Sequence, residues 1–224
     1  MSWDPVWEEV YRSRAWGQYP GEDVVRFVMS HHGRSADRAQ VRLLEVGSGP
    51  GANLWFMARE GFSTHGVEGS ETAVRLCNER LDRDCPEWRT HGGRVQAGDL
   101  AALPYGDGYF DAVLDVVAIC YSPLAQAQAA YRELARVTRP GGRLFSRTFA
   151  QGCWGDGTGE QVEPGMWICG EGHLKGYGAT RFTAREDVPA LVQGWSVERV
   201  ERSAVTEDNG RHEISHLLVH GIKP

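Results

Sequence analysis

The stretch LEVGSGPG, residues 44–51, decides the fold that we expect for this chain. It closes an apolar run that begins at Val41, and a helical pattern follows it from about Ala52 to Glu60. Glycines directly after a buried strand let a ligand approach the backbone closely and leave N–H groups free to meet it. The stretch therefore predicts a strand, a ligand-binding turn and a helix, as in nucleotide-binding α/β proteins.

The glycine spacing alone leaves the ligand open. Gly47, Gly49 and Ala52 satisfy the G-x-G-x-x-G/A fingerprint of dinucleotide-binding proteins. Glu68 follows about 20 residues later, where an acidic side chain suits ribose hydroxyls under either interpretation. A nicotinamide cofactor, and hence an NAD(P)-dependent oxidoreductase, is therefore one interpretation of these residues.

Outside this stretch, strand-like apolar runs alternate with helical patterns, which is typical of a mostly parallel sheet. The last two runs flank Asn209-Gly210, a strong hairpin signal. We predict one α/β domain with a Rossmann-like, three-layer architecture and a mostly parallel seven-stranded sheet that ends in an antiparallel hairpin. The expected strands are 41–46, 63–68, 94–97, 111–117, 143–149, 197–205 and 213–221. Ser122-Pro123 is expected to open a helix that runs to about residue 138, and a capping box at Thr183 to open the last one.

Four segments together resemble the class I S-adenosylmethionine (SAM)-dependent methyltransferases. EVGSGPG at 45–51 resembles the E/D-x-G-x-G-x-G motif I, and VEGS at 67–70 resembles the second motif. GDL at 98–100 is similar to the adenine-binding segment of the family. Residues 103–113 with 133–142 are close to the family pattern around the fourth strand and the helix after it. The resemblance covers roughly 41–149 and the C-terminal strands, and it implies SAM as the cofactor.

The resemblance also implies a role for individual residues. The glycines of motif I would line the methionine part of SAM with Glu45 nearby, Glu68 would accept from the ribose, and Asp99 with Leu100 would bind adenine. The cofactor-binding residues expected in this way are Tyr11, Trp16, Glu45, Gly47, Ser48, Gly49, Gly51, Glu68, Gly69, Ser70, Asp99, Leu100 and Asp115. No metal ligand is expected.

Two further segments are candidates for acceptor binding. Residues 1–40 are predicted to form an N-terminal helical lid, because their aromatic-rich beginning resembles the lid of small-molecule methyltransferases and aromatic faces attract a sulfonium. Simple packing of the same aromatic residues on the domain is the alternative. Residues 41–224 are expected to form the methyltransferase domain, with a glycine-rich acceptor-recognition insertion at about 150–182.

Tyr121 and His173 are the predicted catalytic residues. Tyr121 follows the fourth strand, where the methyl group should emerge, and its hydroxyl would orient or deprotonate an acceptor. His173 lies in the insertion, and an imidazole titrates near neutral pH. An ordinary surface histidine is the alternative for His173.

Composition limits the class of partner. The net charge is −6 without a basic cluster, which argues against nucleic acid and favours a small-molecule acceptor. Five irregularly spaced cysteines indicate reduced thiols, not a disulfide framework or zinc site. The beginning of the sequence lacks a signal-peptide pattern, and no run reaches the ~18 apolar residues of a membrane span, so we expect a cytoplasmic protein away from membranes. Monomer and homodimer are both compatible with the sequence.

The predicted function is methyl transfer from SAM to an oxygen or nitrogen atom of a small molecule. The alternatives are the NAD(P)-dependent oxidoreductase and a protein that binds SAM without catalysis.

Overall fold

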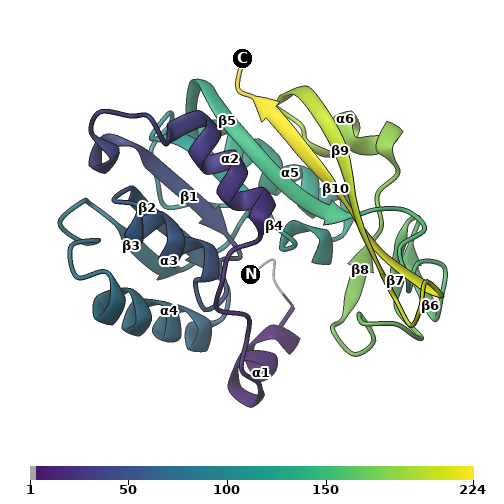
Figure 1. Cartoon of the computed structure of the whole chain (residues 1–224). Coiled ribbons are helices and arrows are strands. Elements are labelled where there is room, and N and C mark those ends of the chain that lie inside the picture. Colours follow the sequence, from purple (N-terminus) through teal and green to yellow (C-terminus); the bar gives the residue numbers. More distant parts are fainter. Residues whose placement is uncertain (1–3) are drawn as a thin grey trace.

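A seven-stranded sheet forms the centre of the protein (Figure 1), which is described by a computed structural model over residues 4–224. The first three residues of the predicted lid, Met1 to Trp3, lie outside the described residues. The strands of this sheet are β1 (Arg42–Val46), β2 (Ser63–Glu68), β3 (Arg94–Ala97), β4 (Phe110–Val116), β5 (Thr138–Phe149), β9 (Ser196–Glu207) and β10 (His212–Ile222). Their order is β3-β2-β1-β4-β5-β10-β9.

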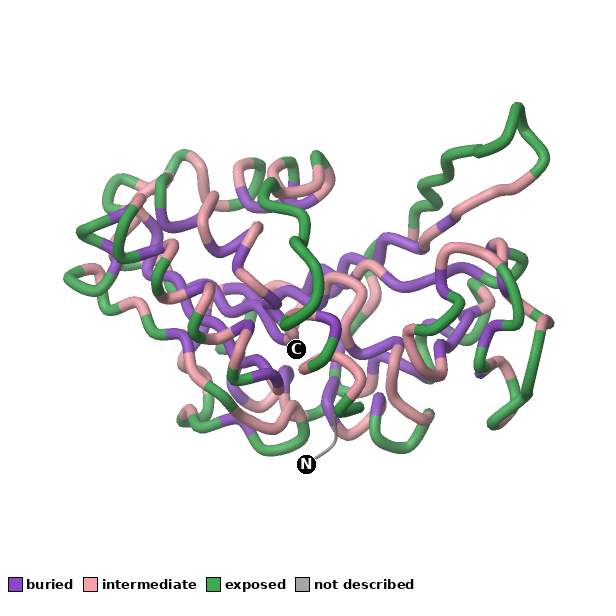
Figure 2. The backbone as a smooth tube through the Cα atoms, turned by 90° about the horizontal axis from the view of Figure 1, so that it is seen from below, coloured by how far each residue is buried: buried purple, intermediate pink, exposed green. Residues whose placement is uncertain are grey.

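The strand directions confirm the predicted fold class. β1 to β5 pair in parallel, whereas β10 is antiparallel to both β5 and β9. The turn between β9 and β10 contains Asp208, Asn209 and Gly210, all with positive φ, as a tight hairpin requires. Figure 2 shows the outer half of this hairpin extending away from the sheet as exposed chain.

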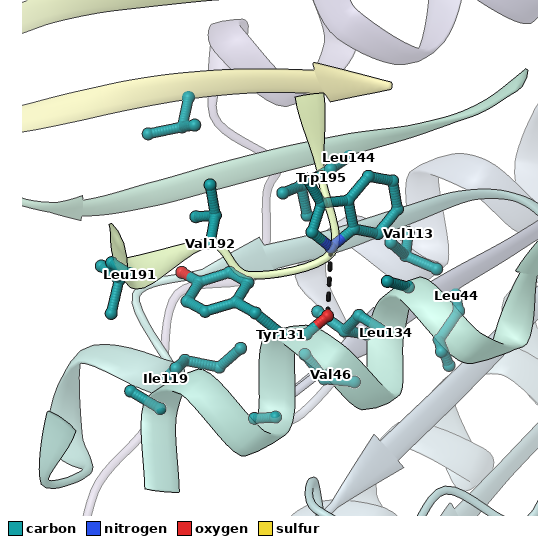
Figure 3. Packing of buried hydrophobic residues seen from close by; sticks show 14 of the residues in the cluster. Leu44, Val46, Val113, Ile119, Tyr131, Leu134, Leu144, Leu191, Val192 and Trp195 are labelled. Carbon is teal, nitrogen blue, oxygen red and sulfur yellow. Dashed lines mark hydrogen bonds between the residues drawn. The ribbon is translucent and has the colours of Figure 1, made fainter. Parts of the chain in front are cut away.

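Helices cover both faces of the sheet and complete the three layers. They are α1 (Val6–Ser13), α2 (Glu22–His32), α3 (Ala52–Arg59), α4 (Glu71–Asp84), α5 (Leu124–Val137) and the short α6 (Val188–Leu191). α2, α3 and α4 bury Val24, Leu54 and Leu81 in one core. α5 and α6 pack on the opposite face, where the Trp195 indole donates to the Tyr131 carbonyl at 3.1 Å (Figure 3). β1 is buried from Leu43 to Val46 because it contributes to both cores.

The insertion after β5 has a regular structure of its own. β6 (Glu160–Glu163), β7 (Met166–Ile168) and β8 (Ala179–Arg181) form a three-stranded antiparallel sheet. A bridge between Ala150 and Thr183 brings the two ends of the insertion together. In Figure 1, the insertion and α1 lie at the same end of the main sheet.

Three local predictions were wrong. β5 begins at Thr138, because the Pro-Gly-Gly segment continues the strand with a register shift opposite β4. We expected Ser122 at the N-cap of α5, but Pro123 occupies this position, and no side chain caps the helix there. The last helix has only four residues, and Thr183 does not cap it. The Thr183 N–H instead donates to Phe149 at the base of the insertion, and its hydroxyl has no hydrogen-bond partner.

None of the helices within residues 4–224 is long and apolar enough to cross a membrane.

Candidate functional site

A cavity of about 440 Å³ lies at the carboxyl ends of β1, β2, β4 and β5. Ligands of open α/β sheets bind at this edge. The glycine turn after β1 and the end of β2 form one wall, and α1 and the insertion close the others. The lid segment, residues 1–40, is divided by the structure. α1 borders the cavity, whereas α2 belongs to the core of the domain.

The turn after β1 depends on its glycines. Gly47, Gly49 and Gly51 have φ values of +61°, +50° and +85°, which other residues rarely adopt. Gly47 and Gly49 line the cavity together with Ser48, as expected of a ligand-binding turn. Gly51 differs, because a Cβ there would lie 2.3 Å from the sulfur of Cys77 in α4. Position 51 therefore requires a glycine because α4 packs closely against it, and not because it contacts the cavity.

The carboxylate of Glu68 is fixed by backbone amides at the end of β2. Its Oε2 accepts from the Gly49 N–H at 2.8 Å, and its Oε1 accepts from the Ser70 N–H at 2.9 Å. Glu68 and Gly69 line the cavity, whereas the Ser70 side chain caps α4 by accepting from Ala73. A carboxylate oxygen accepts more than one hydrogen bond, so Glu68 retains capacity for two hydroxyl groups of a ligand.

Glu45 presents an unpaired oxygen in the cavity wall. Its Oε1 accepts from the Asn53 amide at 2.5 Å, but its buried Oε2 has no partner. Burial raises the pKa of this carboxyl to about 8. An ammonium group of a ligand would satisfy the free oxygen and stabilise the ionised form.

Asp99 and Asp115 are not among the described residues that line the cavity, although Gly98 and Leu100 on either side of Asp99 are. Leu100 lines the cavity, but the side chain of Asp99 accepts from the Ala101 N–H at 3.0 Å. Asp115 is completely buried on the opposite face of the sheet. Its carboxylate accepts from the hydroxyls of Tyr131 and Ser146 and from two backbone amides of the turn after β4.

Five aromatic side chains from the lid, the end of β4 and the insertion meet at the cavity. We call them the aromatic cluster: Trp7, Tyr11, Trp16, Tyr121 and Tyr177. The Trp7 ring lies 4.7 Å from that of Tyr121 and 5.7 Å from that of Tyr177, between centroids. The lid and the insertion, which are distant in sequence, therefore share one wall of the site.

Tyr121 and His173, the predicted catalytic residues, both line this part of the cavity. Their rings flank Phe149, at centroid distances of 6.4 and 5.7 Å. Burial raises the pKa of Tyr121 well above its usual value, so its hydroxyl stays protonated. Burial lowers the pKa of His173, so the imidazole is neutral at pH 7, and neither of its nitrogens has a hydrogen-bond partner. The pair thus combines a hydroxyl donor with a neutral nitrogen base.

Sequence reasoning missed Arg147, which lies at the end of β5 and lines the cavity. Its Nη1 forms an ion pair with Asp23 at the beginning of α2. The available signal was a single cation within the otherwise uncharged run LFSRTF, residues 144–149.

Comparison with known proteins identifies the domain. Residues 44–146 match the family model described as a methyltransferase domain. Residues 44–146 thus form a SAM-dependent methyltransferase domain. This match decides between the cofactors that the glycine spacing left open, in favour of SAM.

Individual relatives agree with this assignment. The chain is 32% identical over 133 residues to demethylmenaquinone methyltransferase of Tropheryma whipplei, covering 57% of this chain and 52% of that protein. It is 32% identical over 120 residues to malonyl-[acyl-carrier protein] O-methyltransferase of Erwinia pyrifoliae, covering 50% and 38%. The chain thus spans about half or less of these relatives.

The fold resembles that of Burkholderia thailandensis 1,6-didemethyltoxoflavin-N1-methyltransferase, solved with S-adenosylhomocysteine. The TM-score is 0.66 at 17% identity, covering 90% of this chain and 77% of that one.

The lining of the cavity fits SAM. The unpaired oxygen of Glu45 suits the ammonium group, and the fixed carboxylate of Glu68 suits the ribose hydroxyls. A Cβ at Gly49 would lie 3.0 Å from the Tyr11 hydroxyl in the cavity, so its absence keeps this part of the cavity open, whereas a Cβ at Gly47 would lie 2.2 Å from that of Ala118.

Proposed function

We propose that this methyltransferase transfers the methyl group of SAM to an oxygen or nitrogen atom of a small, partly aromatic acceptor. The aromatic cluster supports this proposal, because it forms a wall of flat rings that carries tyrosine hydroxyls, and the unpaired His173 nitrogens belong to the same cavity lining. Relatives whose names specify an O-methyltransferase and an N1-methyltransferase make both acceptor atoms reasonable.

The proposed mechanism depends mainly on alignment. When bound, SAM supplies a methyl group already activated by a sulfonium centre. The aromatic cluster would hold the acceptor in line with that methyl group and exclude water, and such alignment contributes roughly 7–11 kcal/mol to lowering a barrier. Tyr121 would donate a hydrogen bond to the acceptor. His173 would accept the proton that a hydroxyl acceptor loses, which contributes about 10² to 10⁴ in rate.

The same proposal assigns a role to the N-terminal segment and to the insertion. Residues 1–40 supply the lid through α1, and the insertion at about 150–182 supplies acceptor contacts through Tyr177 and His173. We place the protein in the cytoplasm, as a monomer or homodimer, because its five cysteines are buried free thiols.

The test is to incubate the purified protein with methyl-labelled SAM and fractionated small-molecule extracts. Release of S-adenosylhomocysteine together with a labelled small product would support the proposal. The variants Tyr121→Phe and His173→Asn should then lower kcat or raise the KM of the acceptor, with the affinity for S-adenosylhomocysteine little changed. Tight SAM binding without a labelled product from any fraction would instead favour a non-catalytic SAM-binding protein.

A further inference from the structure

Arg147 is a charged residue of the cavity wall that has no role in the mechanism proposed above. In the parallel register of β4 and β5 it lies beside Val116, at the edge where the cavity opens. Its Nη1 donates to both carboxylate oxygens of Asp23, at 3.2 and 3.1 Å. Because this ion pair joins β5 to the first turn of α2, it fixes one corner of the guanidinium group.

The other edge of this guanidinium lacks a partner. Nε is buried without a hydrogen bond, and no acceptor for Nη2 is found among residues 4–224. Nε and the adjacent Nη form the edge that can bind a carboxylate through two parallel hydrogen bonds. Since buried polar groups in folded proteins are nearly always paired, the buried Nε indicates an acceptor supplied from outside the protein.

Glu45 supplies the complementary charge in the same cavity. Its Oε2 is buried and unpaired, and the charge of Arg147 is near enough to lower the pKa of the Glu45 carboxyl against the effect of burial. One unsatisfied carboxylate oxygen and one unsatisfied guanidinium edge therefore border the same cavity. An α-amino acid carries an ammonium and a carboxylate on a single carbon, so it matches both groups at once.

We propose that Arg147, held in place by Asp23, binds the α-carboxylate of the methionine part of SAM while Glu45 accepts from the α-ammonium group. Arg147 is then a specificity residue that selects adenosyl ligands with an intact amino acid. The inference rests on SAM as the cofactor of this site, and it does not depend on the acceptor proposed above.

The test compares two ligands that differ only in this carboxylate. Titration calorimetry would measure the affinities for S-adenosylhomocysteine and for its decarboxylated analogue. In the wild-type protein the carboxylate should raise the affinity roughly 10- to 100-fold, as expected for a hydrogen-bonded ion pair. Arg147→Gln should bring this ratio close to one. The matched control is Arg143→Gln in the same strand, whose partner is Glu198, and it should retain the wild-type ratio.

Two outcomes would overturn the proposal. They are a wild-type ratio near one, and a folded Arg147→Gln protein that keeps the full ratio. If Arg147→Gln does not fold, Arg147→Lys keeps the positive charge near Asp23 but lacks the two-pronged edge, so it should lower the ratio at an unchanged melting temperature. Binding of S-adenosylhomocysteine needs no acceptor, so failure of the acceptor proposal leaves this result interpretable.

Discussion

Glu8 joins α1 to the N-terminus of α4, and its removal should loosen α1. Its carboxylate accepts from the hydroxyls of Ser70 and Thr72, at the N-terminus of α4. These hydrogen bonds lower the pKa of Glu8 to about 2. A negative charge at a helix N-terminus is favourable, so Glu8 acts as a second cap that α1 contributes to another helix.

The effect of Glu8→Ala can be estimated from these contacts. Hydrogen bonds to a charged group contribute about 1.5–3 kcal/mol when buried, but the Glu8 side chain retains 19% exposure and solvent weakens the interaction. We therefore expect about 1–2 kcal/mol for docking of α1, or a change of 5- to 30-fold in the docked population. The melting temperature should change little, because Val10 is the only buried residue of α1.

Hydrogen exchange of residues 6–13 would measure this change. Exchange should accelerate about 5- to 30-fold in Glu8→Ala, and S-adenosylhomocysteine should restore part of the protection by closing the lid. Glu9→Ala is the control, because Glu9 is exposed on the same helix. Because folding lowers the pKa of Glu8, its contribution to the docking of α1 is complete above about pH 4.5 and is lost as the pH falls toward 2. Wild-type exchange in Glu8→Ala, or the same acceleration in Glu9→Ala, would refute this reasoning.

Three further predictions concern the cofactor site. Because burial raises the pKa of Glu45 to about 8, folding favours its protonated form, and the ligand-free protein should lose stability as the pH rises from about 4.5 to 8. Binding of S-adenosylhomocysteine should strengthen over pH 6–8, and Glu45→Gln should flatten that dependence in calorimetry. Glu68→Ala should weaken SAM and S-adenosylhomocysteine together by roughly tenfold or more, and an unchanged affinity for both would contradict the ribose assignment. Gly49→Val should abolish binding while circular dichroism shows a folded protein, because a side chain there enters the cavity beside the Tyr11 hydroxyl at a φ of +50°; wild-type affinity would exclude this role.

Sequence reasoning placed correctly those cavity residues whose position is set by the strand that they directly follow. Gly47, Gly49 and Glu68 occupy turns that directly follow strands, and parallel strands bring such turns to one edge. The order of these motifs along the chain was therefore sufficient to identify the fold and the cofactor.

Other parts depend on contacts between distant segments. Gly51 is required by Cys77 of α4, and no local pattern identifies that partner. Asp115 pairs in register with Val46, which follows Glu45, so the two acidic side chains point to opposite faces of the sheet. The strand register that separates them is not visible in the sequence.

The insertion was the least predictable element. Its strands contain only three or four residues, too few for a periodic pattern to stand out between glycines. The ion pair of Arg147 with Asp23 connects residues 124 positions apart, so only the folded chain reveals that this cation borders the cavity.

The bridge between Ala150 and Thr183 has an evolutionary consequence. The chain leaves the main sheet and returns to it at adjacent positions, with Gln151 donating to the Thr183 carbonyl and Thr183 to that of Phe149. The segment between these two anchoring points can therefore change in length and sequence while its ends stay fixed. Glu45 and Glu68 lie outside this segment, so exchanging residues 152–182 would change the wall of the cavity that holds His173 and Tyr177 without rebuilding the turns after β1 and β2.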